Sequence, residues 1–183
     1  MAEQVQITLF TFDELPEESQ QKIIEGFRQD FDPDYSIVYD EFIIDMSEQY
    51  GADIKEDNIQ WSGFWSQGDG ACFTCDFDEE VIFSILKKRV YGTDQVRLLE
   101  ELGVELHSAK SIRCGFSNHY CHENTVTGNI VFNVPAGKEF NHEIALSLEE
   151  ELTKIIRESC KDLYRRLEEE YDEATTDEAI ITE

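Results

Sequence analysis

The residues best suited to chemistry are two short groups of cysteine and histidine. Cys72 and Cys75 form a CxxC pair, and Cys121 adjoins His122 later in the chain. Thiolates and imidazoles are the ligands of tetrahedral zinc sites, so two neighbouring hairpins could unite Cys72, Cys75, Cys121 and His122 around a metal ion. A strand, however, turns Cys72 and Cys75 to opposite faces, and no turn residue separates them. We therefore expect no metal and no cofactor.

The same residues could also supply a nucleophile and a base. In the run His119-Tyr-Cys-His-Glu, Cys121 would be the nucleophile and His122 the base, with Asp69 as a partner to check. Adjacent residues on a strand point apart, which works against this pair. Cysteines buried as small apolar side chains are the simpler interpretation. We expect a non-enzymatic protein, and a small zinc-dependent or thiol enzyme is the alternative.

The most distinctive stretch is the run from Trp61 to Ala71, WSGFWSQGDGA. Gly68 and Gly70 flank an aspartate, which is typical of a tight turn between two strands. In one interpretation both tryptophans pack on helices and the turn is structural. In the other, the tip is a recognition loop that displays Trp65, Gln67 and Asp69. No phosphate-binding loop is present, because the glycines lack the GxxxxGK[ST] pattern.

These segments need a scaffold, and hydrophobic periodicity indicates one. It predicts strands over residues 4–12, 58–64, 71–77, 111–116 and 125–134. It predicts helices over residues 13–31, 35–50 and 141–171, with shorter ones capped by Asp78 and Thr93. The result is an α+β fold: an antiparallel sheet of hairpins, four or five strands in all, packed on one side by several helices, including a long C-terminal helix. Residues 1–172 would form a single α+β domain, followed by an acidic flexible tail over residues 173–183.

The charge of the chain is its strongest signal. Its 183 residues include 41 acidic and 15 basic ones, a net charge of −26. Residues 11–57 hold fifteen acidic and three basic residues, and residues 168–183 hold eight acidic residues and no basic one. Solubility or adaptation to salt is one explanation. The other is imitation of nucleic-acid phosphates, since duplex DNA carries about one charge per 1.7 Å of its axis.

Uneven charge favours imitation, because a surface that serves solubility alone mixes both signs. We expect the partner-binding surface to comprise the helical carboxylates together with the tip of the hairpin: Asp30, Asp32, Asp34, Asp40, Glu41, Asp45, Glu48, Trp65, Gln67 and Asp69. Further candidates lie earlier in the chain: Asp13, Glu14, Glu17 and Glu18.

The N-terminal segment MAEQVQITLF has no basic residue and no long apolar run, so we expect no signal peptide. No stretch approaches the roughly 18 apolar residues of a membrane span. The sequence thus predicts a cytoplasmic protein with reduced thiols and no membrane contact.

The strings WSGFWSQGDGA, TFDELPEES and HYCHENT resemble a family of small proteins found mainly in phages and mobile elements, loosely labelled as an antitoxin component. The resemblance implies a phage-encoded protein that acts inside a bacterial host cell. The family offers no catalytic residues that could be assigned to this chain. In size and acidity the chain also looks like an anti-CRISPR or anti-restriction protein.

We therefore predict an inhibitor that binds a basic nucleic-acid-binding protein through DNA-like charge mimicry. The partner would be a Cas effector, a restriction enzyme or a toxin, and we expect no direct contact with nucleic acid. The alternatives are the small zinc-dependent or thiol enzyme named above and an antitoxin-like partner of a toxin.

Overall fold

The structure is a computed structural model that describes residues 8–31, 33–90, 99, 101–114, 120–138 and 140–182. By the contacts among its residues the chain divides into two units, which we name the acidic unit (residues 1–34 and 169–183) and the sheet unit (residues 35–168). The elements that follow are η1 (Phe12–Glu14), α1 (Glu17–Asp30), α2 (Ser36–Tyr50), β1 (Ala52–Ser62), β2 (Gly70–Phe77), α3 (Glu79–Val90), β3 (Glu105–Arg113), η2 (Glu123–Thr125), β4 (Val126–Asn133), α5 (His142–Ala174) and α6 (Asp177–Thr182).

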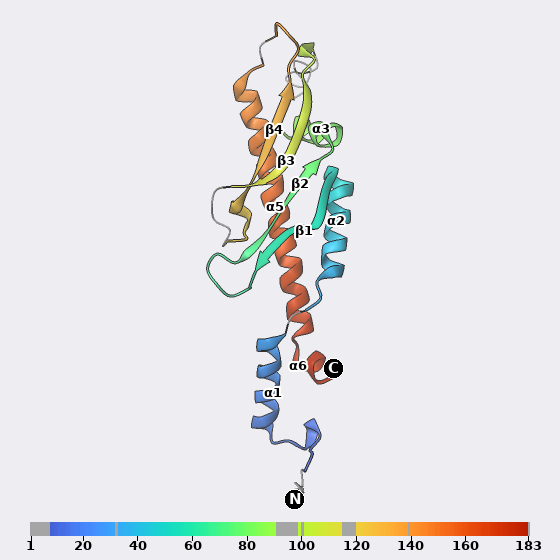
Figure 1. The fold of residues 1–183 in the computed structure, drawn as a ribbon, viewed down its shortest axis with the longest axis vertical. Helices are drawn as coiled ribbons and strands as arrows, with labels where there is room; N and C mark the ends of the chain where they lie inside the picture. The colour runs from blue at the N-terminus through green and yellow to red at the C-terminus, as the bar shows by residue number, and fades with distance from the viewer. Residues whose placement is uncertain are drawn as a thin grey trace, which may run out of the picture. The chain divides into compact units, whose positions relative to one another are not determined.

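Four antiparallel strands form one sheet in the order β1-β2-β3-β4 (Figure 1). Ala52 pairs with Phe77, Phe77 with Ala109 and Ala109 with Ile130, so one row of mostly apolar residues crosses all four strands. Paired residues of antiparallel strands point to the same face, which makes this row part of a core. The predicted α+β fold is confirmed.

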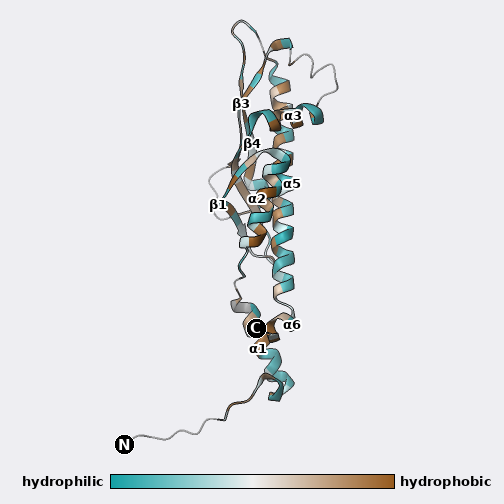
Figure 2. Ribbon diagram, turned by 90° about the vertical axis from the view of Figure 1, so that its right-hand side faces the viewer, coloured by the Kyte–Doolittle hydropathy of each residue, from teal (hydrophilic) through white to brown (hydrophobic). Residues whose placement is uncertain are grey.

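The helices α2, α3 and α5 cover one face of the sheet (Figure 2). Phe42 of α2 meets Phe73 of β2 edge to face, with ring centroids 5.4 Å apart, and both side chains are buried. Leu148, Leu152, Ile155, Leu163 and Leu167 form the buried stripe of α5. Their spacing of three, four and eight residues is the helical pattern expected from the sequence.

Several predicted boundaries agree with the structure because the responsible residues act locally. Gly51 ends α2 with a φ of 66°, a left-handed conformation that glycine adopts without strain. Asp78 caps α3 by accepting a hydrogen bond from the Val81 amide at 2.9 Å. Asn141 does the same for α5, accepting from the Glu143 amide at 2.9 Å.

The strand predicted over residues 4–12 is wrong where the structure describes it. Residues 8–11 lie in no strand, and η1 begins at Phe12; residues 4–7 are outside the described residues. Leu9 is 87% exposed and Phe10 62% exposed. Alternation of apolar residues produces a strand only where a neighbouring strand accepts its backbone hydrogen bonds, and no described strand lies there.

Other boundaries also differ from the prediction. The strand predicted over residues 111–116 is β3, which spans Glu105–Arg113 and so begins six residues earlier. The first helix begins at Glu17 because Pro16, the residue before it, has an extended ψ of 143°. β1 begins at Ala52 rather than residue 58, because Ala52 and Ile54 are buried while the acidic residues between and after them face solvent. The helix predicted after Thr93 lies largely outside the described residues, although Leu99 is helical and buried.

The domain boundary predicted at residue 172 falls inside α5, which continues to Ala174. Residues 177–182, expected to belong to a flexible tail, form α6, and Thr175 before it is buried. The end of α5 and α6 belong to the acidic unit together with α1.

Candidate functional site

The acidic unit joins the two segments that the sequence identifies as most acidic. The Nε of Arg28 in α1 donates to the Thr175 carbonyl oxygen at 2.9 Å, and its guanidinium also pairs with Asp177 of α6. The Tyr171 hydroxyl donates to the Arg28 carbonyl oxygen at 3.3 Å. Two segments more than a hundred residues apart therefore meet around one arginine.

Charge is unevenly divided between the two units. The 49 residues of the acidic unit include 16 acidic residues and two basic ones, Lys22 and Arg28, a net of −14. The 134 residues of the sheet unit include 25 acidic and 13 basic residues, a net of −12. More than half of the excess charge thus belongs to about a quarter of the chain.

Most of these carboxylates face solvent. Exposed acidic residues of the described acidic unit are Asp13, Glu14, Glu17, Glu18, Glu25, Asp34, Glu169, Glu170, Asp172, Glu173, Asp177 and Glu178. Glu14 accepts a hydrogen bond from the Thr11 amide at 2.9 Å, which lowers the pKa of its carboxyl group. Glu18 pairs with Lys22 at 2.7 Å. Self-repulsion at this density opposes compactness unless cations gather on the surface.

The predicted partner-binding carboxylates separate into two places. Asp34 is exposed in the acidic unit, whereas Asp32 and the side chain of Asp30 lie outside the described residues. Asp40, Glu41, Asp45 and Glu48 are exposed on α2 in the sheet unit. At 1.5 Å of rise per residue these four span about 12 Å, or one charge per about 4 Å, close to the 3.4 Å of a single DNA strand.

Asp45 is partly neutralised within this row. Its carboxylate accepts from Arg166 of α5 at 2.6 Å, and Arg166 also pairs with Asp162 at 2.8 Å. Burial opposes ionisation of Arg166, but the hydrogen bond to Asp45 and the charge of Asp162 raise the pKa of the guanidinium overall. Asp45 therefore attaches α2 to α5, a role that its position on an acidic helix face did not reveal.

The tip of the β1–β2 hairpin displays an aromatic side chain. Trp65 is 77% exposed, and Gln67 is exposed beside it. Asp69 accepts hydrogen bonds from the amides of Trp65 at 3.0 Å and Ser66 at 2.6 Å, so its carboxylate organises the turn instead of facing a partner. Gly68 supports the turn with a φ of 99°. Of the three residues predicted for recognition, Trp65 and Gln67 are exposed, and Asp69 organises the turn.

The base of this hairpin is fixed to two helices. The Trp61 indole nitrogen donates to the Tyr39 hydroxyl at 2.9 Å, and its ring meets that of Tyr35 at 5.0 Å. The Tyr164 hydroxyl of α5 donates to the Gly63 carbonyl oxygen at 2.9 Å. The two tryptophans therefore differ: Trp61 packs on α2 as the structural interpretation predicts, whereas Trp65 is exposed, and its role in recognition stays a prediction.

The zinc set does not assemble. Among the described residues, no three His, Cys, Asp or Glu side chains come close enough together to hold a metal ion. Cys72 accepts from the Arg113 guanidinium at 2.5 Å, whereas Cys75 lies on the opposite side of β2 and pairs in register with Ser111. His122 uses its Nδ1 to accept from the Asn124 amide at 3.2 Å, which starts η2.

The buried thiols are poor nucleophiles at neutral pH. Burial raises the pKa of Cys72, an effect that hydrogen bonding to Thr125 and the charge of Arg113 only partly offset. Burial likewise raises the pKa of Cys75 to about 12 and that of Cys160 far above its ordinary range. Because the thiolate is the reactive form, these three cysteines behave as small core residues.

The fold and surface define an acidic α+β protein with one strongly charged helical unit and one exposed tryptophan. A family model described as "Domain of unknown function (DUF8835)" matches residues 35–177, so the chain belongs to that family. The match spans the sheet unit and reaches the start of α6, and α1 lies outside it. No curated protein and no solved structure matches the chain. None of the described helices has the length and apolar content needed to cross a bilayer.

Proposed function

We propose that this protein is a non-enzymatic inhibitor that binds the cationic groove of a nucleic-acid-binding protein by charge mimicry. The observation that carries the proposal is the acidic unit, whose sequence holds 16 acidic residues against two basic ones and whose two segments meet around Arg28. A groove built for a polyanion attracts such a surface before any contact forms, because complementary potentials steer association. In keeping with the resemblance to phage proteins, we place the partner in host defence: a Cas effector, a restriction enzyme or a toxin.

The row of carboxylates on α2 supplies a second acidic surface, on the sheet unit. Asp40, Glu41 and Glu48 are exposed there and are not paired with Arg166 as Asp45 is. Complementary charge contributes association rate and specificity more than raw affinity. Much of the affinity must therefore come from shape or apolar contact.

Trp65 supplies that contact. Exposed tryptophans dominate binding energy at protein interfaces because they bury a large area at little conformational cost. The turn held by Asp69 and the packing of Trp61 present Trp65 on a rigid support, which limits the entropy lost on binding. We therefore assign affinity and selectivity to Trp65 and long-range attraction to the carboxylates.

The test is a pair of variants with the same change in charge. The first carries Glu25→Gln, Glu170→Gln, Asp172→Asn and Glu173→Gln, all exposed in the acidic unit. The second carries Glu80→Gln, Glu101→Gln, Glu105→Gln and Glu143→Gln, all exposed in the sheet unit and none of them on α2. Each raises the net charge by four, so a difference between them reports the position of the charge.

The parent chain and each variant are used to capture partners from bacterial lysate at low and high salt. Each captured protein is then loaded with labelled duplex DNA, and the release of this DNA on addition of the parent chain or a variant is measured. We expect the parent chain to capture nucleic-acid-binding proteins and displace their DNA. The acidic-unit variant should bind the partner at least about tenfold more weakly than the parent chain. Raising the salt from about 0.05 to 0.2 M should steeply lower the affinity of the parent chain for the partner. Equal binding by both variants, or indifference to salt, would refute charge mimicry.

A further inference from the structure

The outer edge of β4 faces a regular row of side chains on α5. Glu149, Thr153, Arg157 and Lys161 recur every four residues and therefore share one face of the helix. The Glu149 carboxylate accepts from the Ile130 amide at 3.3 Å, and the Thr153 hydroxyl accepts from the Gly128 amide at 2.9 Å. These two side chains satisfy backbone donors that an edge strand would otherwise expose to another strand. Lys161, at the other end of the row, lies 3.8 Å from Glu123.

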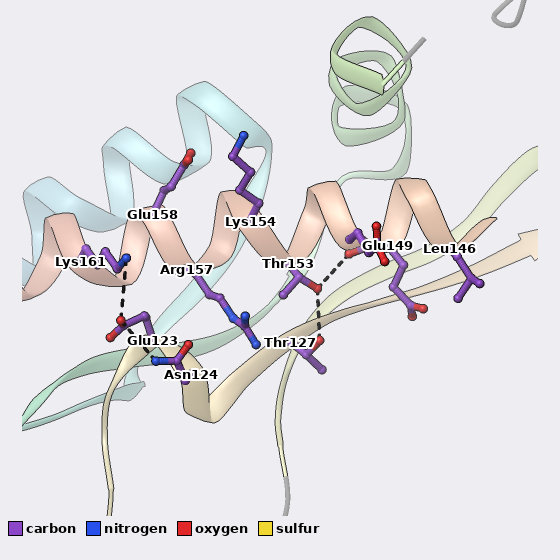
Figure 3. Close-up of a pocket in the computed structure, with 11 residues that line it drawn as sticks. Glu123, Asn124, Thr127, Leu146, Glu149, Thr153, Lys154, Arg157, Glu158 and Lys161 are labelled. Carbon is purple, nitrogen blue, oxygen red and sulfur yellow. Dashed lines mark hydrogen bonds and ion pairs between the residues drawn. The ribbon is translucent and has the colours of Figure 1, made fainter. Parts of the chain in front are cut away.

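Arg157 is the exception in this row. Its Nε is buried, and within the described part of the chain no acceptor bonds to it. Figure 3 shows its guanidinium reaching into a cleft toward Asn124 and Thr127. A buried donor of a charged group that finds no acceptor is costly, and a guanidinium cannot lose its charge. The observation is unexpected in a chain with 41 acidic residues, because carboxylates are abundant on the same helix.

The cleft has the size of a ligand site. It encloses about 550 Å³ between α5, η2 and β4, within the range of small-molecule pockets. Its lining combines three basic and four acidic residues with Asn124, Thr127, Thr153 and Leu146; the charged ones are Lys154, Arg157, Lys161, Glu123, Glu149, Glu150 and Glu158. The Thr127 hydroxyl lies 3.1 Å from that of Thr153, and the Asn124 amide lies 3.4 Å from Glu123. Polar groups of both strand and helix thus converge beside the guanidinium.

The charges of the lining select the class of ligand. A guanidinium fork pairs in plane with the two oxygens of a carboxylate or with a phosphate. A phosphate monoester carries about −1.5 to −2 at neutral pH, whereas a carboxylate carries a single charge. Four glutamates in the lining and a net charge of −26 oppose the higher charge more strongly.

We propose that this cleft binds a small molecule with one carboxylate group, which Arg157 holds through its guanidinium. The Asn124 side-chain amide donates its second hydrogen to the remaining lone pairs, and Leu146 at the end of the cleft contacts the apolar part of the molecule. The site is independent of the acidic unit and of Trp65. The proposal of ligand binding can therefore be tested separately from that of charge mimicry.

The experiment follows the Nε–Hε signals of arginine in nitrogen-15-labelled protein. Sodium acetate, sodium benzoate and sodium phosphate are titrated at constant ionic strength against sodium chloride. We expect acetate and benzoate to shift one signal saturably, with benzoate binding more tightly because of Leu146, and phosphate to bind more weakly than either. That signal should be absent in the Arg157→Gln variant. It should persist in the Arg165→Gln variant, which is the control because Arg165 lies on the same helix and pairs with Asp162 at 2.6 Å.

Two further variants separate binding from folding. Arg157→Met keeps the aliphatic stem without the charge, so its melting temperature without ligand should equal or exceed that of the parent. The increase in melting temperature that benzoate gives the parent should vanish in this variant. Asn124→Ala should weaken benzoate binding by about three- to tenfold. A response to chloride equal to that to acetate, tighter binding of phosphate, or unchanged benzoate binding by Arg157→Gln would overturn the proposal.

Discussion

The sheet unit and the acidic unit balance charge against burial in opposite ways. Nearly all buried apolar side chains of the described chain belong to the sheet unit, whereas Ile24 is the one buried apolar residue described in the acidic unit. Yet the acidic unit carries the larger net charge, −14 over 49 residues. A segment with strong self-repulsion and a small core opens at low free energy, and a cationic partner would stabilise it by mass action. If the proposed function holds, the sheet unit supplies stability and the acidic unit supplies interaction.

The largest effect that tests this contrast is loss of a core ring. Phe73 is fully buried against Phe42, so Phe73→Ala should lower the free energy of unfolding by about 3–5 kcal/mol. Ile24→Ala should leave the main transition in place and reduce amide-exchange protection in α1 alone. Urea unfolding followed by tryptophan fluorescence, since both tryptophans lie in the sheet unit, measures the first quantity. An equal shift of the midpoint by Ile24→Ala would show that the two units unfold as one.

Two glycines, one in each unit, test whether the sheet unit is more tightly packed than the acidic unit. A Cβ at Gly128 would come within 2.8 Å of Leu152 on α5, so Gly128→Ala should destabilise the sheet unit by about 1–3 kcal/mol. A Cβ at Gly26 in α1 would meet nothing within 4 Å, so Gly26→Ala should stabilise that helix by about 0.5–1 kcal/mol. Thermal unfolding measures the first and amide exchange in α1 the second. Destabilisation by Gly26→Ala would indicate that this face of α1 is packed.

The smallest effect concerns the thiols, which burial divides into two groups. Cys114 is exposed and should react first with iodoacetamide at about pH 8. Burial raises the pKa of Cys75 to about 12, so its thiolate fraction stays low until the pH approaches that value, and labelling should follow the same rise. Mass spectrometry of the folded protein over this pH range gives the order of labelling. Rapid labelling of Cys72 or Cys75 near neutral pH would restore the thiol-enzyme alternative.

Local signals in the sequence predicted local structure well. Gly51, Asp78 and Asn141 each terminate or begin a helix through their own backbone or side chain, so their neighbours in sequence suffice to identify them. Periodicity also gave the apolar stripe of α5, because a helix that packs on a sheet must bury one face. The N-terminal strand could not be judged in this way. Its alternation is the same whether or not a partner strand is present, and Leu9 is in fact exposed.

In the candidate sites, too, local features could be predicted from the sequence, whereas features that depend on distant partners could not. The glycines and aromatics of the hairpin predicted a tight turn, but only packing distinguished Trp61, which is bonded to Tyr39, from the exposed Trp65. Asp45 and Asp69 looked like surface carboxylates. Their partners, Arg166 and the backbone amides of the turn, come from the folded arrangement.

The composition, the excess of 26 negative charges and the residues that begin or end helices and turns can all be read from the sequence, because they depend on residue type and near neighbours. The tertiary structure decided which distant residues meet. It joined residues near both ends of the chain around Arg28, paired Asp45 with Arg166, and left the Nε of Arg157, in a cleft beside β4, without an acceptor among the described residues. Such pairings depend on the path of the whole chain, so no window of sequence contains them.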